Sequence, residues 1–207
     1  LLDVSHELKT PLTRMRLMVE MMPNKGPAKE LKEEINFLNE LISNLLLSDR
    51  LDLPYSKLDI KKISGIDLIN KSVLTFNDYQ KNKIEIIEKG EGFFVNVDIT
   101  KMIVVIRNLV QNSFKYADTE RGVSIILDNN KESSLIRVRD YGSGITKEES
   151  NKIFEPFYRS HGTKKISGIG LGLSISKKII KSHRGNIKLN FDVSSGTEFN
   201  LYLPKGD

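Results

Sequence analysis

Apolar residues in the first 45 positions recur at alternating spacings of three and four, which is the heptad pattern of paired helices. A short loop-like sequence at residues 23–29, "PNKGPAK", separates two such runs. Two heptad helices joined by so short a loop predict an antiparallel helical hairpin. The first run consists of Leu1, Val4, Leu8, Pro11, Met15, Met18 and Met22, and the second of Leu31, Ile35, Leu38, Ile42 and Leu45.

This hairpin is too small to bury a sufficient core alone, because two helices expose most of their surface. Its apolar seams are suited to pairing with a second copy of the chain. We therefore expect a homodimer whose two hairpins form a four-helix bundle.

Beyond this hairpin the pattern changes to alternating strands and helices. Residues 49–60, "DRLDLPYSKLDI", break the helical pattern. The expected helices cover 66–79, 99–117 and 172–183, and the expected strand pairs are 83–89 with 93–98, 122–128 with 134–141, and 185–191 with 197–204. Three helices with about six mostly antiparallel strands indicate an α+β domain of two layers. The predicted organisation is a hairpin at 1–53, a linker at 54–64 and an α+β domain at 65–207.

Composition adds few constraints. The net charge of +5 comes from interspersed lysines and acids, which favours an ordinary solvated surface over a dedicated DNA-binding one. The absence of cysteine excludes disulfides and thiolate metal sites. No apolar run approaches the roughly 20 residues that a membrane-spanning helix needs. The abrupt start at Leu1 in a helical pattern suggests a fragment of a longer protein.

One histidine of the first helix stands out by its position. In the heptad register, His6 falls opposite the apolar seam, with Glu7 beside it and Thr10 on the same face. A packing histidine belongs on the seam, so the alternatives are a solvated surface histidine or a nucleophile with a neighbouring base. Pro11 follows in the helix interior, where a proline bends or weakens a helix.

The long helix at 99–117 carries its polar residues on one side. Asn108, Asn112, Lys115 and Tyr116 share this face by three- and four-residue spacing. An ordinary wet face of an amphipathic helix would look similar. Two asparagines four residues apart nevertheless favour a binding role, because amide oxygen is a suitable ligand for Mg²⁺ and the lysine can neutralise phosphate charge.

Two glycine-rich segments follow. In "DYGSG", Asp140 ends a strand and precedes Gly142 and Gly144, which fits either a turn or a carboxylate that accepts a hydrogen bond from a base. In "GIGLGL", Gly168, Gly170 and Gly172 precede or begin a helix, without the spacing of a Walker loop or a dinucleotide fingerprint. Glycine amides at a helix start can still bind phosphates. The polar segment 154–166 between them, "FEPFYRSHGTKKI", is typical of a nucleotide lid.

Together these segments resemble the sensor histidine kinases of bacterial two-component signalling. "SHELKTPL" is similar to the H box of that family, "NLVQNSFKY" to its N box, and "DYGSG" to its G1 box. "FEPFYR" resembles the F box and "GIGLGL" the G2 box, and all five occur in the family's order across nearly the whole chain. The opening run "SHELKTPLTRMRL" looks closest to the osmosensing and envelope-stress branch.

The resemblance implies a role for each matching residue. His6 would be the phosphoacceptor, Glu7 its acid–base partner, and Thr10 the residue that positions water during dephosphorylation of a response regulator. Asn112 would bind Mg²⁺, and Asp140 would read the adenine amine. The other implied contacts to ATP are Asn108, Lys115, Tyr116, Gly142, Gly144, Phe157, Gly168, Gly170, Leu171 and Gly172.

The implied fold of residues 65–207 is the α/β sandwich shared by gyrase, Hsp90 and histidine kinases. The implied protein is the cytoplasmic portion of a membrane-anchored, homodimeric sensor that uses ATP and Mg²⁺. It would phosphorylate itself on His6, pass the phosphoryl group to a response-regulator aspartate, and act as a phosphatase of that regulator. Two alternatives remain: an ATPase or chaperone-like clamp, which leaves His6 unused, and a non-catalytic dimeric scaffold.

Overall fold

The computed structural model describes residues 2–22, 27–52, 57–90, 92–117, 120–129, 133–160 and 169–205, with the backbone alone for 2–9, 52 and 133. The chain divides into two compact units, Leu1–Ser56 and Lys57–Asp207. Each unit has its own core and is described by itself. None of the helices in these ranges combines the length and the apolar character needed to cross a bilayer.

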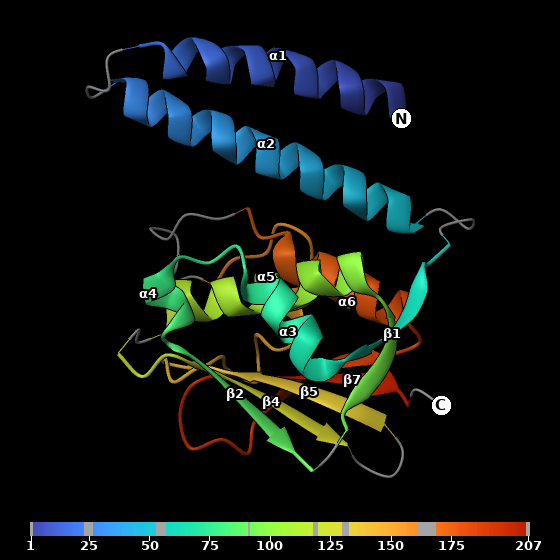
Figure 1. Ribbon diagram of the computed structural model, residues 1–207. Coiled ribbons are helices and arrows are strands. Elements are labelled where there is room, and N and C mark those ends of the chain that lie inside the picture. Colours follow the sequence, from blue (N-terminus) through green and yellow to red (C-terminus); the bar gives the residue numbers. More distant parts are fainter. Residues whose placement is uncertain are drawn as a thin grey trace. The chain divides into compact units, whose positions relative to one another are not determined.

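The first unit is the predicted helical hairpin. Helix α1 covers Leu2–Glu20 and continues through Pro11, and helix α2 covers Pro27–Asp52 (Figure 1). The two helices pack along a narrow apolar stripe. Its buried members are Leu12, Val19, Ala28 and Ile35, with Ile42 packed against them.

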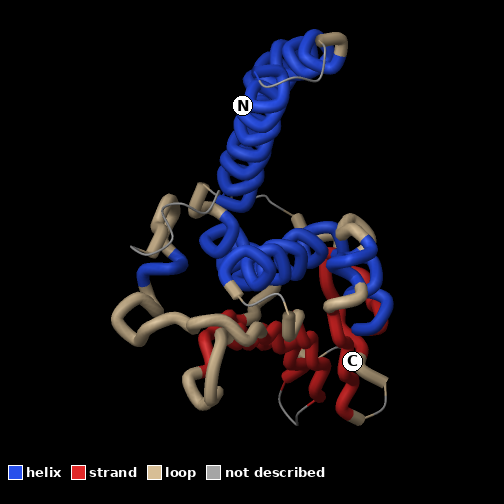
Figure 2. Tube along the Cα trace, turned by 90° about the vertical axis from the view of Figure 1, so that its left-hand side faces the viewer, coloured by secondary structure: helices blue, strands red, loops and turns tan. Residues whose placement is uncertain are grey.

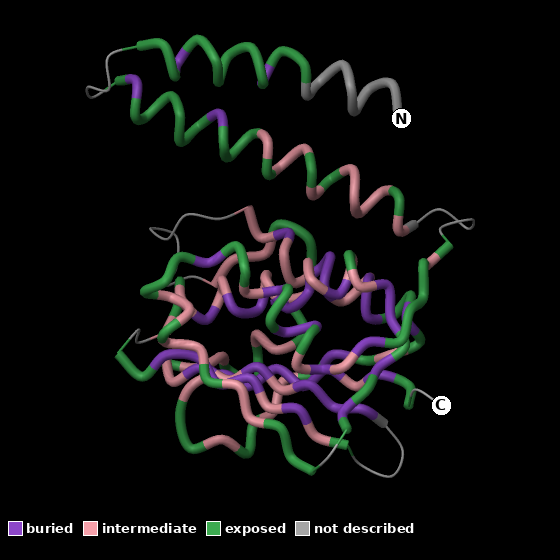
Figure 3. The backbone as a smooth tube through the Cα atoms, viewed as in Figure 1, coloured by how far each residue is buried: buried purple, intermediate pink, exposed green. Residues whose placement is uncertain are grey.

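The stripe on α1 differs from the predicted seam. Leu12 and Val19, which the seam omits, make the contact within the hairpin, whereas Met15, Met18 and Met22 are exposed. Figure 3 shows how little of the hairpin is buried. The physical reason is that a helix in a bundle contacts two neighbours, so its apolar face is wider than one heptad seam. On α2, Ile35 and Ile42 of the predicted seam pack within the hairpin, whereas Leu31, Leu38 and Leu45 are exposed. Each helix therefore keeps exposed apolar residues.

The second unit contains a five-stranded sheet in the order β2-β4-β5-β7-β6. Strand β2 runs parallel to β4, and every other neighbouring pair is antiparallel. The strands are β2 (Ile84–Lys89), β4 (Val123–Asn129), β5 (Ser133–Arg139), β6 (Asn186–Asn190) and β7 (Glu198–Pro204). Helices α3 (Gly65–Val73), α5 (Ile99–Tyr116) and α6 (Gly172–Ser182) cover one face of this sheet (Figures 1 and 2). The short elements are α4 (Asp78–Lys81) and the 3₁₀ turn η1 (Lys152–Phe154).

The core lies between the sheet and the helices. Ile125 and Val138 face each other across β4 and β5, as do Leu127 and Ile136, and all four are buried. Because side chains alternate along a strand, these residues share the face toward the helices. The buried residues of α5 recur at helical spacing and complete the core: Met102, Val105, Ile106, Leu109, Val110 and Ser113. The predicted two-layer α+β architecture is confirmed.

Two sequence-based expectations about strands are wrong. Residues 83–89 and 93–98 do not pair with each other, because β2 joins the large sheet and β3 (Phe94–Asp98) pairs with β1 (Ile60–Ser64) in a separate two-stranded sheet. Strand β1 lies within the segment expected to be a linker. Only Ile63 of β1 is buried, so the polar sequence "IKKIS" lacks the alternation that marks a strand.

The expected helix at 66–79 is divided into two. The Ser64 side chain accepts a hydrogen bond from the Asp67 N–H and caps α3, which ends at Val73. A second cap follows at Asn77, whose side chain and that of Gln80 form a reciprocal capping box at the start of α4. The apolar periodicity continues across both helices, which is why it predicted only one.

Candidate functional site

Helix α5 positions the predicted magnesium and phosphate residues. Asp98 caps its first turn by accepting a hydrogen bond from the Lys101 N–H at 3.1 Å. Opposite the buried stripe, Asn108 and Asn112 are half-buried, while Lys115 and Tyr116 are exposed in the last turn. The face predicted to be polar therefore combines two partly shielded amides with an exposed cation and an exposed ring.

The N-box face of α5 meets the start of α6. Asn108 Nδ2 donates a hydrogen bond to the Gly172 carbonyl oxygen at 3.3 Å. A methyl group added at Gly172 would lie 3.5 Å from Asn108 Cγ, an ordinary van der Waals contact. Ser176 Oγ donates to the same carbonyl at 2.9 Å. This contact joins the predicted N and G2 boxes, which are far apart in sequence.

Asp140 lies directly after β5 and is only 6% exposed. Its Oδ1 accepts hydrogen bonds from the Gly142 N–H at 3.1 Å and the Thr197 N–H at 2.9 Å. Burial raises the pKa of the Asp140 carboxyl, although these two amides, with the side chains of Thr197 and Ser113, oppose the rise. The result is a shielded carboxylate held in one orientation by backbone donors.

Two of these partners, Thr197 and Ser113, are not indicated by the sequence. Thr197 lies 57 residues from Asp140 and comes just before the last strand. Ser113 lies among the buried residues of α5, and its side chain also bonds to Asp140. A threonine preceding a buried strand carries no local signal for a binding site. The pairing of β5 with β7 is what brings Thr197 to the carboxylate.

The glycines of "DYGSG" let this loop approach α5. A methyl group at Gly142 would lie 2.8 Å from Ala117 Cα and 3.0 Å from the Tyr116 carbonyl oxygen. The contact with Ala117 Cα is shorter than real Cβ atoms show, so Gly142 allows the loop to pack against the end of α5. Gly144 follows in the same loop with a φ of +79°.

The predicted F and G2 boxes also contact each other. The Phe157 N–H donates a hydrogen bond to the Gly170 carbonyl oxygen at 2.9 Å. Phe157 has a φ of +65° and an exposed ring, and a methyl group at Gly170 would lie 2.7 Å from the Tyr158 carbonyl oxygen. Leu171 is buried beside this contact, at the N-cap of α6. Gly168 lies outside the described residues.

A polar cluster holds the segment that follows Phe157. Glu149 accepts hydrogen bonds from the Tyr158 hydroxyl at 3.2 Å, from the Ser160 hydroxyl, and from the Thr146 hydroxyl at 3.3 Å. The Ser160 bond has the largest effect and, with the others, lowers the pKa of the Glu149 carboxyl. The carboxylate thus fastens residues 158–160 to the turn before η1.

The predicted phosphoacceptor group belongs to the other unit. His6 and Glu7 lie within α1, and their side chains are outside the described part of the chain. Thr10 is exposed one turn later. The structure therefore brings together the predicted nucleotide residues of α5, the Asp140 loop and the start of α6, and it places His6, Glu7 and Thr10 on the hairpin.

Comparison with protein families gives two matches, one in each unit. Residues 97–207 match the histidine kinase-, DNA gyrase B- and HSP90-like ATPase family. The chain belongs to this family. Residues 1–54 match the His Kinase A phospho-acceptor domain, so the ATPase module follows a phospho-acceptor module in the same chain. The family resemblance and the fold class expected from the sequence are both confirmed.

Curated relatives carry both modules. The sensor protein kinase WalK of Staphylococcus haemolyticus is 32% identical over 216 residues, which cover 98% of this chain and 36% of WalK. The sensor protein ChvG of Agrobacterium fabrum is 29% identical, covering 99% of this chain and 38% of ChvG. The chain thus spans little more than a third of the length of either relative.

Solved structures share the fold. Full-length ShkA in complex with AMPPNP matches with a TM-score of 0.78 at 20% identity, covering 99% of this chain and 46% of ShkA. The histidine kinase ThkA in complex with the response regulator protein TrrA matches with a TM-score of 0.62 at 28% identity. That match covers 99% of this chain and 60% of the ThkA chain.

Proposed function

We propose that the chain is the kinase core of a sensor histidine kinase, an ATP-dependent protein histidine kinase that phosphorylates itself on His6. The observation that carries this proposal is the coexistence of a phospho-acceptor domain at 1–54 and an ATPase domain at 97–207. An ATPase or chaperone-like clamp would need only the second. The hairpin serves dimerisation and phosphotransfer, and residues 65–207, with β1 added, serve ATP binding.

The adenine of ATP fits beside Asp140. A buried carboxylate already held by two amides can accept a further hydrogen bond from the exocyclic amine. Tyr116, at the end of α5 where Gly142 packs, supplies an aromatic surface next to the base. The contacts of Asn108 with Gly172 and of Phe157 with Gly170 set the walls for the phosphates.

Asn112 and Asn108 suit a magnesium ion that arrives with the nucleotide. Among the residues whose placement the structure gives, no three His, Cys, Asp or Glu side chains form a cluster that could hold a metal. Mg²⁺ usually keeps several waters and phosphate oxygens, so one protein amide oxygen is a sufficient anchor. When bound, the ion would offset phosphate charge. Lys115, one turn further along the helix, adds a positive charge for the phosphates.

His6 is the nucleophile of the proposed reaction. Its imidazole nitrogen attacks the γ-phosphorus in line, the bond from that phosphorus to the β–γ bridging oxygen breaks, and ADP leaves. Glu7 orients the imidazole and accepts its proton. The phosphoryl group then passes to an aspartate of a response regulator. In the phosphatase reaction, Thr10 positions the water that dephosphorylates that regulator.

The exposed seam of the hairpin supports the proposed homodimer. Met18 is 66% exposed on α1 and Leu38 is 40% exposed on α2, which leaves apolar surface for a second hairpin. Similarity to the sensor proteins WalK and ChvG supports a longer protein of the osmosensing and envelope-stress branch. In that protein this chain is the cytoplasmic portion, anchored to the inner membrane upstream of Leu1.

Labelling with γ-³²P-ATP and Mg²⁺ tests the proposal. The chain contains three histidines, His6, His161 and His183, which provides a matched control. We expect the native chain and His161→Gln to take up label, and His6→Gln to take up none while binding ATP normally. A His6→Gln chain that is labelled like the native one would refute the proposal.

A further inference from the structure

Tyr141 lies between Asp140 and Gly142, and no step proposed so far uses its side chain. On β5, Ile136 and Val138 are buried toward the helices, whereas Arg137 and Arg139 alternate with them on the opposite face. Continued by two residues, this alternation directs Asp140 toward α5 and Tyr141 toward the outer face of the sheet. The bond of Asp140 to Ser113 of α5 agrees with this direction.

On the outer face of the sheet, the Tyr141 hydroxyl is held by Ser124. The Tyr141 hydroxyl lies 3.1 Å from Ser124 Oγ, and the Ser124 hydroxyl donates in turn to Glu85 Oε2 at 3.2 Å. Because the single hydroxyl proton of Ser124 is donated to Glu85, the Tyr141 hydroxyl is the donor in its hydrogen bond with Ser124. The hydroxyl is thereby tied to β4 and, through Glu85, to β2.

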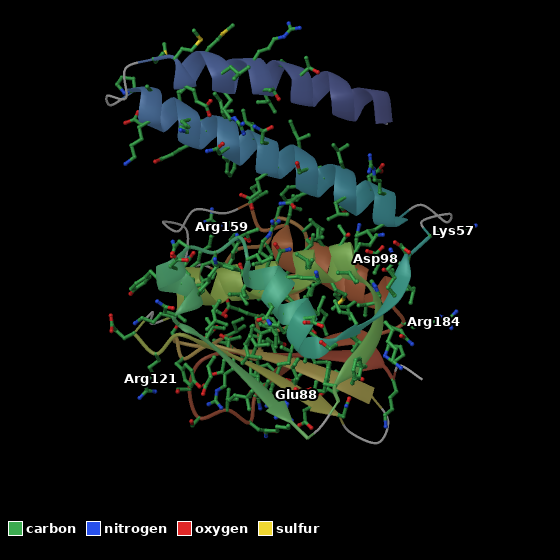
Figure 4. The ribbon with its side chains drawn as sticks, in the orientation of Figure 1. Lys57, Glu88, Asp98, Arg121, Arg159 and Arg184 are labelled. Atoms are coloured by element: carbon green, nitrogen blue, oxygen red, sulfur yellow. The ribbon has the colours of Figure 1, made fainter. Side chains whose placement is uncertain are left out.

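Two guanidinium groups contact the Tyr141 ring. The Arg139 guanidinium carbon lies 5.2 Å from the ring centroid and that of Arg121 lies 5.8 Å from it, both within the range of cation–π attraction. Arg139 comes from β5, and Arg121 comes from the turn before β4, at the lower left in Figure 4. The ring thus contacts side chains from β5 and from the turn that leads into β4.

This anchoring determines where a site donor points. The Gly142 N–H belongs to the peptide group that begins at Tyr141, and it donates to Asp140 Oδ1. Gly142 is also packed against Ala117, so the turn is fixed by α5 on one side and by the tyrosine on the other. If the tyrosine were released, the Gly142 peptide could rotate and the carboxylate would lose one of its two backbone donors.

We propose that Tyr141 is a positioning residue for base recognition: its ring, held by Arg121, Arg139 and Ser124, fixes the Gly142 peptide and so aims the Asp140 carboxylate at the exocyclic amine of adenine. This inference rests on the proposed role of Asp140 in ATP binding. It predicts that Tyr141 affects selectivity for the amine more than overall affinity for nucleotide.

Calorimetric titration of the full chain in the His6→Gln background, with Mg²⁺ present, tests the proposal. The probes are ATP and purine riboside triphosphate, which lacks the exocyclic amine. We expect the parent chain to prefer ATP by roughly ten- to a hundredfold, because the analogue leaves a buried carboxylate unpaired. Tyr141→Leu should reduce that preference about five- to tenfold, mainly by lowering the affinity for ATP.

Tyr202→Leu is the matched control. Tyr202 lies on β7 with Lys188 Nζ 6.0 Å from its ring centroid, and it has no contact with Asp140. Its removal should leave the preference unchanged. The proposal is overturned if Tyr141→Leu retains the parent preference for ATP. This includes the case in which the affinities for both nucleotides fall by the same factor. A parent chain with no preference would instead remove the proposed role of Asp140, and this inference with it.

Two milder variants cover the case in which Tyr141→Leu does not fold. Tyr141→Phe removes only the hydroxyl donor to Ser124, and Arg121→Met removes one guanidinium from an exposed turn. Each should lower the preference for ATP about twofold. Unchanged preferences in both variants would overturn the proposal as firmly as an unchanged Tyr141→Leu.

Discussion

Replacing Asp140 with asparagine separates the proposed binding role of this residue from its structural role. The substitution keeps the shape and one acceptor oxygen, so the hydrogen bonds from the Gly142 and Thr197 amides, at 3.1 and 2.9 Å, can persist. It removes a negative charge from a side chain that is nearly buried. We expect the fold to tolerate the change and ATP binding to suffer from it.

The effect on stability follows from the pKa. Burial raises the folded-state pKa of Asp140 above 3.8, its ordinary value in an unfolded chain. Between those two values the folded state binds more protons than the unfolded state, so stability falls as pH rises through the folded pKa. Asparagine does not titrate and avoids this loss. At neutral pH the free energy of unfolding of Asp140→Asn should therefore equal or exceed that of the native chain.

The expected effect of Asp140→Asn on the affinity for ATP is larger than its effect on stability. A hydrogen bond to a charged group contributes about 1.5–3 kcal/mol, which corresponds to roughly a 10- to 150-fold change in Kd. The geometry favours the upper end, because Oδ1 is already held by two amides and the asparagine would present its NH₂ group to the adenine amine. Two donors would then face each other.

Calorimetry with ATP and urea unfolding measure these two quantities on the same samples. We expect a Kd for ATP raised by at least about tenfold, with no loss of unfolding free energy. ATP affinity within about threefold of the native chain would refute the role of Asp140 in base recognition. A weakened affinity that merely follows a loss of stability would refute it as well.

Three further predictions concern other parts of the chain. Arg184 has a φ of +58° just after α6, and its side chain points away from the domain in Figure 4. Arg184→Gly should therefore raise the free energy of unfolding in urea by about 0.5–1 kcal/mol. An unchanged or lower free energy would contradict this reasoning. Leu38→Glu should shift the chain toward monomer in sedimentation velocity, whereas Glu33→Lys, on the opposite side of α2, should not. Equal dimer fractions in the two variants would exclude Leu38 from the interface. Burial lowers the pKa of His183, whose Nε2 accepts a hydrogen bond from the Asp98 N–H at 2.9 Å. The melting temperature of the native chain should therefore fall as pH drops below 6.5, and that of His183→Gln should fall less. Identical slopes of melting temperature against pH would exclude this histidine as the cause.

Strong local periodicity made the helices predictable. The expected helix at 99–117 corresponds to α5 at Ile99–Tyr116, because six buried residues recur at helical spacing and Asp98 provides a cap. The strand pairs β4 with β5 and β6 with β7 were predicted for a similar reason, since short turns join neighbours in sequence.

Pairing between distant segments was not predictable in the same way. Residues 83–89 and 93–98 are neighbours in sequence and were expected to pair, but β3 pairs with β1, some 30 residues earlier, and β2 runs parallel to β4. The same limit applies to the site. Asp140, Gly142 and Gly170 belong to local motifs and could be named from the sequence, whereas Thr197 reaches Asp140 only because β7 lies beside β5.

The chemical stability of the label on the protein tests the central claim most directly. After incubation with γ-³²P-ATP and Mg²⁺, the labelled chain is treated separately with acid and with alkali. A phosphoryl group on the imidazole of His6 should survive alkali, be lost in acid, and be absent from His6→Gln. Free phosphate released without labelled protein, or a label that survives acid, would contradict the assignment of a histidine kinase.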